Sequence, residues 1–158
     1  MDDKSKRFLI ISILLIIIGG VAVFNLFQKE PTATKVTEKY VSVEINNKLI
    51  TAEIAKTPQQ ITRGLSDRKS LPKDEGMLFF LGGRRIATFW MKDMLFPIDI
   101  IWIDNEKVVY IIENAPPPNA SSTPTYTPDK PSTHILEVNA GFAQKHNIKV
   151  DDKVTITN

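Results

Sequence analysis

Apolar and polar residues alternate along several short stretches of the chain, and this pattern predicts β-strands. The stretch Tyr40–Ile45 is a clear case, with valine or isoleucine at every second position and serine or glutamate between them. Such alternation is typical of a strand with one buried face. The further strands that the sequence predicts are Leu49–Ile54, Met77–Leu81, Ile86–Met91, Ile98–Ile103, Val108–Ile112, Thr133–Val138 and Val154–Thr157.

The stretch Ile98–Ile103 differs from the others because both of its predicted faces are apolar. Ile98, Ile100 and Trp102 share one face, and Asp99 shares the other face with Ile101 and Ile103. A strand of this kind is predicted to lie in a sheet that is covered on both sides. Asp99 is the exception on its face, because a buried carboxylate is costly unless hydrogen-bond donors surround it.

Two short helices are predicted between the strands. Thr57 is placed to cap the first helix, with Pro58 at its first position, Gln60 completing a capping box and Gly64 ending it. The second helix is predicted at residues 140–146, with Asn139 as its cap.

The turns between the strands set the fold class. Asn46-Asn47, Gly82-Gly83 and the segment Asp104–Lys107 are tight turns, and strands joined by tight turns are antiparallel. The segment Ala115–Pro131 carries six prolines and is predicted to be a long loop, either functional or disordered. We therefore predict a mainly β, β-rich α+β fold: a compact antiparallel barrel or sandwich of about eight strands with two short helices.

An apolar run at residues 8–27 follows a short basic segment. At about 1.5 Å per residue, this run is long enough to cross a hydrocarbon core of ~30 Å. We predict one transmembrane helix in the cell membrane, with residues 1–7 in the cytoplasm, residues 28–38 as a linker and residues 39–158 as an extracytoplasmic domain. A cleaved signal peptide is the alternative for the same segment.

Composition and charge exclude several classes of function. The chain has 158 residues and a formal net charge of only +2, and its basic residues are scattered, so nucleic-acid binding is not predicted. The absence of cysteine excludes thiol nucleophiles and zinc–thiolate sites. No glycine-rich phosphate loop, Ser-His-Asp order or HExxH motif is present, and no cofactor is predicted.

Three residues are candidates for acid–base catalysis: Asp99, Glu137 and His134. A carboxyl group in a dry site has a raised pKa, and Asp99 with Glu137 would form the carboxylate pair of a hydrolase. Each has a structural alternative. Asp99 would accept backbone N–H bonds and fix the adjacent turn, Glu137 would form an ion pair with a cation such as Arg68, and His134 would be an ordinary hydrogen-bonded residue.

A second set of residues is predicted to line a ligand-binding cleft: Arg68, Trp90, Lys92 and Asp93, together with Asp99 and Glu137. An aromatic face offers stacking, and cations bind acidic groups. The alternative is a solvated charged rim with Trp90 in the core.

No metal site is predicted. The residues that come nearest to one are Met94 and His134, because thioethers suit Cu(I) and Met94 is expected to be exposed in its turn.

Several short motifs give the chain a resemblance to a known family. They are Arg63-Gly64-Leu65, Arg68, Gly76-Met77-Leu78-Phe79, Phe89-Trp90-Met91-Lys92, Pro97-Ile98-Asp99-Ile100, Leu136-Glu137 and Gly141. With them the chain resembles the bacterial and archaeal family called domain of unknown function 192, over about residues 40 to 157. The resemblance implies a small, mainly β domain that is often exported behind a signal or anchor, and it implies no established activity. The chain departs from the family pattern at Ser66, where methionine is usual, and at Asp93-Met94, where Asn-Thr is common.

Three hypotheses about function follow. The leading one is a membrane-anchored, extracytoplasmic β domain that binds a small molecule, a glycan or an envelope protein beside the Lys92–Pro97 turn and the proline-rich loop. The second is a small hydrolase or acid–base enzyme that uses Asp99 and Glu137. The third is a structural interaction module of the cell envelope. Binding is favoured over catalysis.

Overall fold

The structure is a computed structural model, and it describes residues 39–157. The predicted anchor at residues 8–27, the segment before it and the linker at residues 28–38 lie outside the described residues. Within residues 39–157, no helix has both the length and the apolar character needed to cross a membrane.

The described residues form mostly strands, as predicted. The strands are β1 (Tyr40–Ile45), β2 (Lys48–Ala55), β3 (Glu75–Arg85), β4 (Phe89–Trp90), β5 (Ile98–Asp104), β6 (Lys107–Ala115), β7 (Thr125–Tyr126), β8 (Ser132–Asn139) and β9 (Val154–Thr157), and the helices are α2 (Pro58–Arg63) and α3 (Phe142–Lys145).

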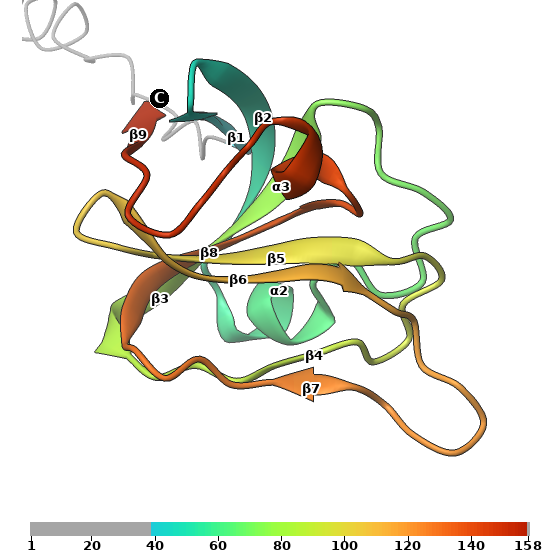
Figure 1. The fold of residues 1–158 in the computed structure, drawn as a ribbon. Coiled ribbons are helices and arrows are strands. Elements are labelled where there is room, and N and C mark those ends of the chain that lie inside the picture. Colours follow the sequence, from blue (N-terminus) through green and yellow to red (C-terminus); the bar gives the residue numbers. More distant parts are fainter. Residues whose placement is uncertain (1–38, 158) are drawn as a thin grey trace, which may run out of the picture. The chain divides into compact units, whose positions relative to one another are not determined.

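Seven strands form one sheet in the order β6-β5-β8-β3-β2-β1-β9 (Figure 1). Neighbouring strands are antiparallel except β2 and β3, which run parallel because the chain crosses between them through α2. The sheet curls so that its two edge strands meet at one end, where Lys107 bridges Lys153 and the Val154 N–H donates to the Glu106 carbonyl at 2.8 Å. The prediction of an antiparallel barrel or sandwich of about eight strands is thereby corrected to a curled half-barrel sheet of seven strands with two short helices.

The segment after Gly82-Gly83 does not fold back as the predicted hairpin. β3 continues through the glycine pair to Arg85, and its pairing with β8 is interrupted between Phe80 and Arg85. Gly82 has φ 70° and no atoms close to where a side chain would lie, so the strand bulges there instead of turning. The predicted strand Ile86–Met91 is reduced to β4, which pairs with β7 of the proline-rich segment in a separate two-stranded ribbon.

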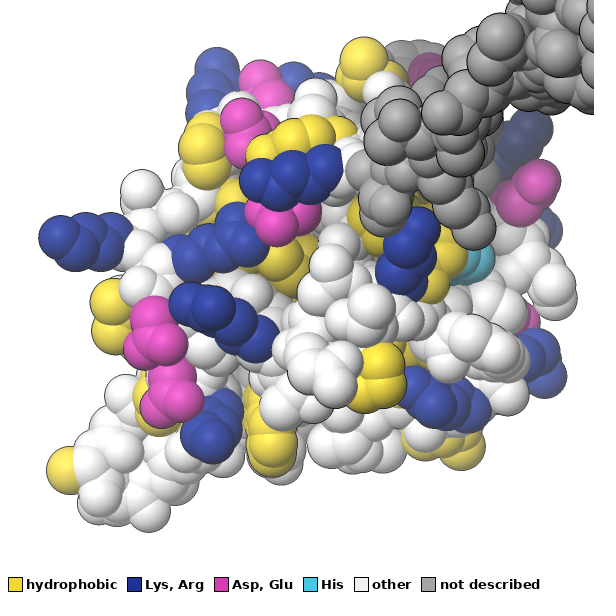
Figure 2. Space-filling model, turned by 180° about the vertical axis from the view of Figure 1, so that it is seen from behind, with side chains coloured by type: hydrophobic (Ala, Val, Ile, Leu, Met, Phe, Trp, Pro, Cys, Tyr) yellow, Lys and Arg dark blue, Asp and Glu magenta, His cyan; other side chains and the backbone are white. Residues whose placement is uncertain are grey.

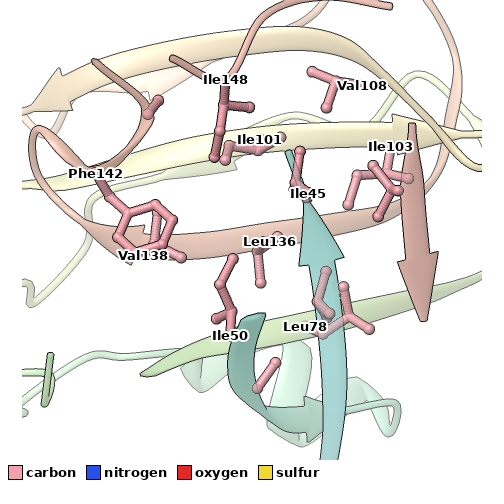
Figure 3. Close-up of a cluster of buried hydrophobic side chains, with 14 of the residues drawn as sticks. Ile45, Ile50, Leu78, Ile101, Ile103, Val108, Leu136, Val138, Phe142 and Ile148 are labelled. Atoms are coloured by element: carbon pink, nitrogen blue, oxygen red, sulfur yellow. The ribbon is translucent and has the colours of Figure 1, made fainter. Parts of the chain in front are cut away.

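β5 is buried along its whole length, and its two faces contact different hydrophobic clusters. Ile101 and Ile103 pack in the first cluster with Leu136 of β8 and Phe142 of α3, which Figure 3 shows. Ile98, Ile100 and Trp102 pack in the second cluster, on the other face. Figure 1 shows α3 and α2 on opposite sides of β5. The predicted division of this strand into two apolar faces is confirmed.

The first helix is capped as predicted, and the second is not. α2 has the expected capping box, with Thr57 Oγ1 accepting from the Gln60 N–H at 3.2 Å and Gln60 Oε1 accepting from the Thr57 N–H at 3.0 Å, and Gly64 ends the helix at φ 50°. α3 is shorter than predicted, and its cap is Gly141 at φ 77°. The predicted cap, Asn139, instead donates its side-chain amide to the backbone carbonyls of Leu71 and Pro72.

Asp99 is fully buried, and three backbone N–H groups surround its carboxyl group. Oδ1 accepts from Asn114 at 2.8 Å and from Gly141 at 3.0 Å, while Oδ2 accepts from Ala143 at 2.8 Å. Asp99 therefore joins the end of β6 to the start of α3. The donors come from these two segments and not from the adjacent turn, as the structural alternative had assumed.

Substitution of Asp99 is expected to destabilise the domain in a graded way. Asp99→Ala leaves three N–H groups without their acceptor, of which that of Ala143 is buried and those of Asn114 and Gly141 are partly buried, and we expect it to lower the free energy of unfolding by about 3 kcal/mol or more. Asp99→Asn keeps one carbonyl oxygen but places an amide donor against one of the N–H groups, so its loss should be smaller. Urea unfolding of both variants measures the difference, with the exposed Asp129→Ala as a control. Equal, small effects of all three substitutions would contradict the structural role.

Candidate functional site

A cleft of about 220 Å³ lies between α2 with the residues that follow it and the segment around β4. Its residues are Ile61, Thr62, Arg63, Gly64, Leu65, Ser66, Phe79, Thr88, Phe89, Trp90, Lys92, Met94 and Glu137. α2 and β4 lie on the same side of β5 in Figure 1, opposite α3. The cleft is thus built on the face of the sheet that carries the second hydrophobic cluster.

The segment around β4 forms one wall by simple alternation. Phe89 and Met91 are buried, whereas Thr88, Trp90 and Lys92 are exposed. The three exposed residues line the cleft, and so does Phe89. Hydrogen bonds hold this short strand in place, since the Met91 N–H donates to the Pro124 carbonyl at 2.9 Å. The proline-rich segment is therefore a support for the cleft wall, although its residues do not line the cleft.

The opposite wall is tied to the same segment. Ser66 Oγ donates to the Lys92 carbonyl at 2.8 Å, and the Asp67 N–H donates to the Asp93 carbonyl at 2.8 Å. Asp93 adopts φ 56°, a left-handed conformation that directs its carbonyl toward this loop without placing its side chain in the cleft. The two walls are thus connected by one side chain–backbone and one backbone–backbone hydrogen bond.

Glu137 lies at the inner end of the cleft. It is only 4% exposed, and its neighbours across β8 are Met77 of β3 and Ile100 of β5. Its Oε2 atom is buried without a hydrogen-bond partner. This atom lies beside Gly64, since a β-carbon added to Gly64 would be 4.0 Å from it. Burial raises the pKa of Glu137 from 4.5 to about 8, and the positive charge of Arg68 opposes this only in part.

The ion pair considered for Glu137 is not formed. Arg68 binds Glu53 instead, with an Nη1–Oε2 distance of 2.9 Å, and lines a neighbouring hollow. No ion pair among residues 39–157 includes Glu137. Glu137 thus lines the cleft with a buried Oε2 atom that no described residue binds.

Trp90 and Lys92 form the outer part of the cleft. Trp90 is 47% exposed, so the alternative that places it in the core is wrong. Lys92 Nζ lies 5.7 Å from the centre of the Trp90 ring, within the range of a cation–π contact, and 4.0 Å from the Asp93 carboxylate. Of the predicted ligand-binding residues, Trp90, Lys92 and Glu137 come together here, whereas Asp93 and Arg68 lie in adjoining hollows.

Asp99 and Glu137 do not form a carboxylate pair. In the register of β5 and β8, Asp99 is opposite Val138 and Ile100 is opposite Glu137, so the two acids point to opposite faces of the sheet. His134 also points away from Glu137. It packs edge-on against Phe80 at 4.7 Å, bonds Thr133 Oγ1 at 3.0 Å, and has its pKa lowered by burial.

The structure gives no support for a metal ligand at Met94 or His134. Met94 is 5% exposed and belongs to the second hydrophobic cluster, so the expectation that it is exposed is wrong. Within residues 39–157, no group of three or more histidine and acidic side chains could hold a metal ion.

The sequence analysis missed the wall formed by residues 61–66 and by Thr88. The motif Arg63-Gly64-Leu65 was noticed, but no binding role was assigned to it. The alternation of residues 88–92 was a usable signal, because residues two apart in a strand share a face and Thr88 could have been grouped with Trp90 and Lys92.

The fold and the cleft define a class: a small, β-rich domain with a curled sheet and one unpaired buried carboxyl group facing a ligand-sized cleft. The family model of DUF192, described as Uncharacterized ACR, matches residues 41–156. The chain belongs to this family, as the resemblance of its motifs indicated.

Two solved structures are similar to the chain. One is a protein of unknown function from Novosphingobium aromaticivorans DSM 12444, with a TM-score of 0.69 and 30% identity over 81% of this chain and 94% of that one. The other is a candidate transcription regulator from Sinorhizobium meliloti 1021, with a TM-score of 0.67 and 27% identity over 77% of this chain and 97% of that one. None of the curated proteins matches the chain.

Replacement of Glu137 by glutamine is expected to change how stability depends on pH. The folded protein keeps the Glu137 proton up to a pKa of about 8, whereas the unfolded chain releases it near 4.5. Because the folded state binds more protons between these values, Glu137 makes stability fall as pH rises through this window, by up to about 1.4 kcal/mol per pH unit. Urea unfolding at about pH 5 and about pH 9 should show Glu137→Gln gaining stability over the unsubstituted protein as pH rises.

The control for this experiment is Glu113→Gln, which removes an exposed carboxylate from β6. It should leave the pH dependence nearly unchanged. If Glu137→Gln and Glu113→Gln give parallel curves, Glu137 does not hold a proton in the folded state.

Proposed function

We propose that this domain is a ligand-binding module, and that its ligand is a small molecule that enters the cleft and bonds Glu137. The observation that carries the proposal is the buried Oε2 atom of Glu137, which has no hydrogen-bond partner and lies beside the cleft. An unsatisfied buried polar atom costs free energy, and a ligand that supplied a donor would recover it.

Binding is favoured over acid–base catalysis by the content of the cleft. Among the described residues that line it, Glu137 is the one acid. The hydrolase hypothesis requires a second carboxylate within reach, and Asp99 faces the other side of the sheet. The cleft has a single acid with a raised pKa, the exposed aromatic ring of Trp90, and a positively charged rim formed by Arg63 and Lys92. This combination favours recognition of a ligand.

The distribution of charge favours a partner other than nucleic acid. On the face shown in Figure 2, Lys and Arg side chains are interspersed with acidic and uncharged ones. Proteins that bind a phosphate backbone group their cations in a patch or stripe. We therefore do not extend to this chain the role of transcription regulator described for the Sinorhizobium meliloti protein.

We further propose that residues 8–27 anchor the protein in the cell membrane and that the domain lies on the outer side. The length of the apolar run and the basic residues before it support this orientation. A ligand-binding domain in this position would take its ligand from outside the cytoplasm.

A thermal-unfolding screen of the full-length protein in detergent tests the binding proposal. The panel comprises amino acids, amines, monosaccharides and short peptides. A ligand at about 100 times its Kd is expected to stabilise the protein by about 2.7 kcal/mol, a shift of several degrees. Thr62→Phe, which places a ring at the cleft, should abolish the shift, whereas Gln59→Phe on the same helix but outside the cleft should preserve it. A shift that survives Thr62→Phe would place the ligand elsewhere.

The topology is testable because the chain has no cysteine. Single cysteines introduced as Asp129→Cys and Lys4→Cys should respond differently to a membrane-impermeant maleimide in intact cells. We expect labelling at position 129 and none at position 4 until the cells are broken. Labelling at neither position in intact cells, with the protein in the soluble fraction, would contradict the anchored orientation.

A further inference from the structure

The chemistry of the inner end of the cleft selects for a hydrogen-bond donor. Glu137 is nearly completely buried, its Oε2 atom is unpartnered, and Gly64 and Phe79 are its neighbours there. An ammonium group is a strong donor for a carboxylate in such a place, since it supplies both charge and a hydrogen bond. The ionised acid would repel a ligand carboxylate or phosphate, and the protonated acid would donate a single O–H···O⁻ hydrogen bond to it, whereas an ammonium group contributes both charge and a hydrogen bond once the Glu137 proton is released.

The other buried residues that line the cleft are apolar: Leu65, Phe79, Phe89 and Met94. A sugar ring placed against them would lose the water bound to several hydroxyl groups without gaining partners, which is unfavourable. A short chain of methylene groups has no such requirement and gains from leaving water.

The outer end of the cleft carries the opposite charge. Arg63 and Lys92 are exposed and line the cleft, and Glu137 is the one acid among its described residues. Among residues 39–157 Arg63 forms no ion pair, and Lys92 forms a long one, with its Nζ 4.0 Å from the Asp93 carboxylate. A plain amine would pass two cations without compensation, whereas a ligand with an anionic outer end would be attracted by them.

The size of the cleft limits the ligand. About 220 Å³ lies below the range of roughly 300–1,000 Å³ that is usual for drug-sized ligands. One short chain with a charged group at each end is compatible with this volume.

We infer that the cleft binds an ω-amino carboxylate: an ammonium group paired with Glu137, a short methylene stem along the apolar lining, and a carboxylate at Arg63 and Lys92. This assignment rests on the proposed function. The same chemistry is present in a free ω-amino acid and in a lysine residue at the carboxyl terminus of a peptide.

Isothermal titration of the full-length protein with three compounds separates the two charged ends. 6-Aminohexanoate carries both groups, hexylamine carries the amine alone and hexanoate carries the carboxylate alone. We expect 6-aminohexanoate to bind at least about tenfold more tightly than either of the others. Equal affinity for 6-aminohexanoate and hexylamine would mean that Arg63 and Lys92 do not bind the ligand carboxylate, and it would overturn the assignment.

Substitutions assign each end of the ligand to its residue. Glu137→Gln should weaken 6-aminohexanoate and hexylamine by at least about tenfold and leave hexanoate unaffected, whereas Lys92→Met should weaken 6-aminohexanoate and hexanoate and leave hexylamine unaffected. Glu113→Gln and Lys130→Met, at exposed positions outside the cleft, are the matched controls. Equal weakening of all three compounds by Glu137→Gln would mean that the substitution disturbs the fold, and would overturn the assignment.

Proton release gives a second readout of the contact with Glu137. Burial keeps this carboxyl group protonated near neutral pH, with a pKa of about 8, so pairing with an ammonium group must expel its proton. The positive charge of Arg68 nearby favours the ionised form that results. Titration in two buffers with different ionisation enthalpies should show proton release on binding of 6-aminohexanoate, and none for Glu137→Gln. Tight binding without proton release would overturn the contact.

Further compounds distinguish a free ω-amino acid from a peptide terminus. They also test the ligand class separately from the proposed function. Tighter binding of Nα-acetyl-lysine than of 6-aminohexanoate would identify a peptide terminus, and the reverse a free ω-amino acid. A monosaccharide that binds in a manner blocked by Thr62→Phe, with no binding of 6-aminohexanoate, would overturn the ligand class and leave the proposed function intact. No stabilisation by any compound of the panel would overturn both.

Discussion

The antiparallel register between β5 and β8 decides the surroundings of two buried acids. Because Asp99 lies opposite Val138 and Glu137 lies opposite Ile100, the two carboxyl groups point to opposite faces of one sheet. A shift of one residue along β5 would exchange its faces, move each apolar set into the cluster that packs around the other set, and carry Asp99 away from its three N–H donors. The two hydrophobic clusters on β5 therefore fix the register, and the register fixes the position of each acid.

The two acids then have opposite energetic consequences. Asp99 receives three backbone N–H groups, so its burial joins β6 to α3 and stabilises the fold. Glu137 receives no donor at Oε2, so its burial costs stability that an apolar residue at the same place would not cost. Sites that violate the rules of stability without compensation in the fold are characteristic of function. The contrast between Asp99 and Glu137 within one pair of strands is the reason to regard the Glu137 face as the functional one.

Local pattern was sufficient to predict the elements but not their partners. The alternation of Tyr40–Ile45 and the capping box at Thr57 are determined by neighbouring residues, and both were predicted correctly. The glycine pair at Gly82-Gly83 was interpreted as a turn, although the same residues also suit a bulge in a continuing strand. The insertion of β8 between β5 and β3 depends on pairings between residues far apart in the sequence, for example Ile103 with His134 and Met77 with Glu137, and no local signal encodes it.

In the candidate site, too, the contacts between sequence neighbours were predictable and the long-range contacts were not. Trp90 and Lys92 are grouped from the sequence because they are close in it, and both are exposed at the cleft, Trp90 in β4 and Lys92 in the turn that follows. Their distance from Glu137 was not predictable, because it depends on the pairing of β8 and on the loop at Ser66 that holds the Lys92 carbonyl. The proline-rich segment, predicted as a long loop, contributes β7, and β7 supports the two residues of β4. A strand of two residues cannot hold an exposed tryptophan in a fixed place by itself, so the long loop serves the cleft by stabilising its wall.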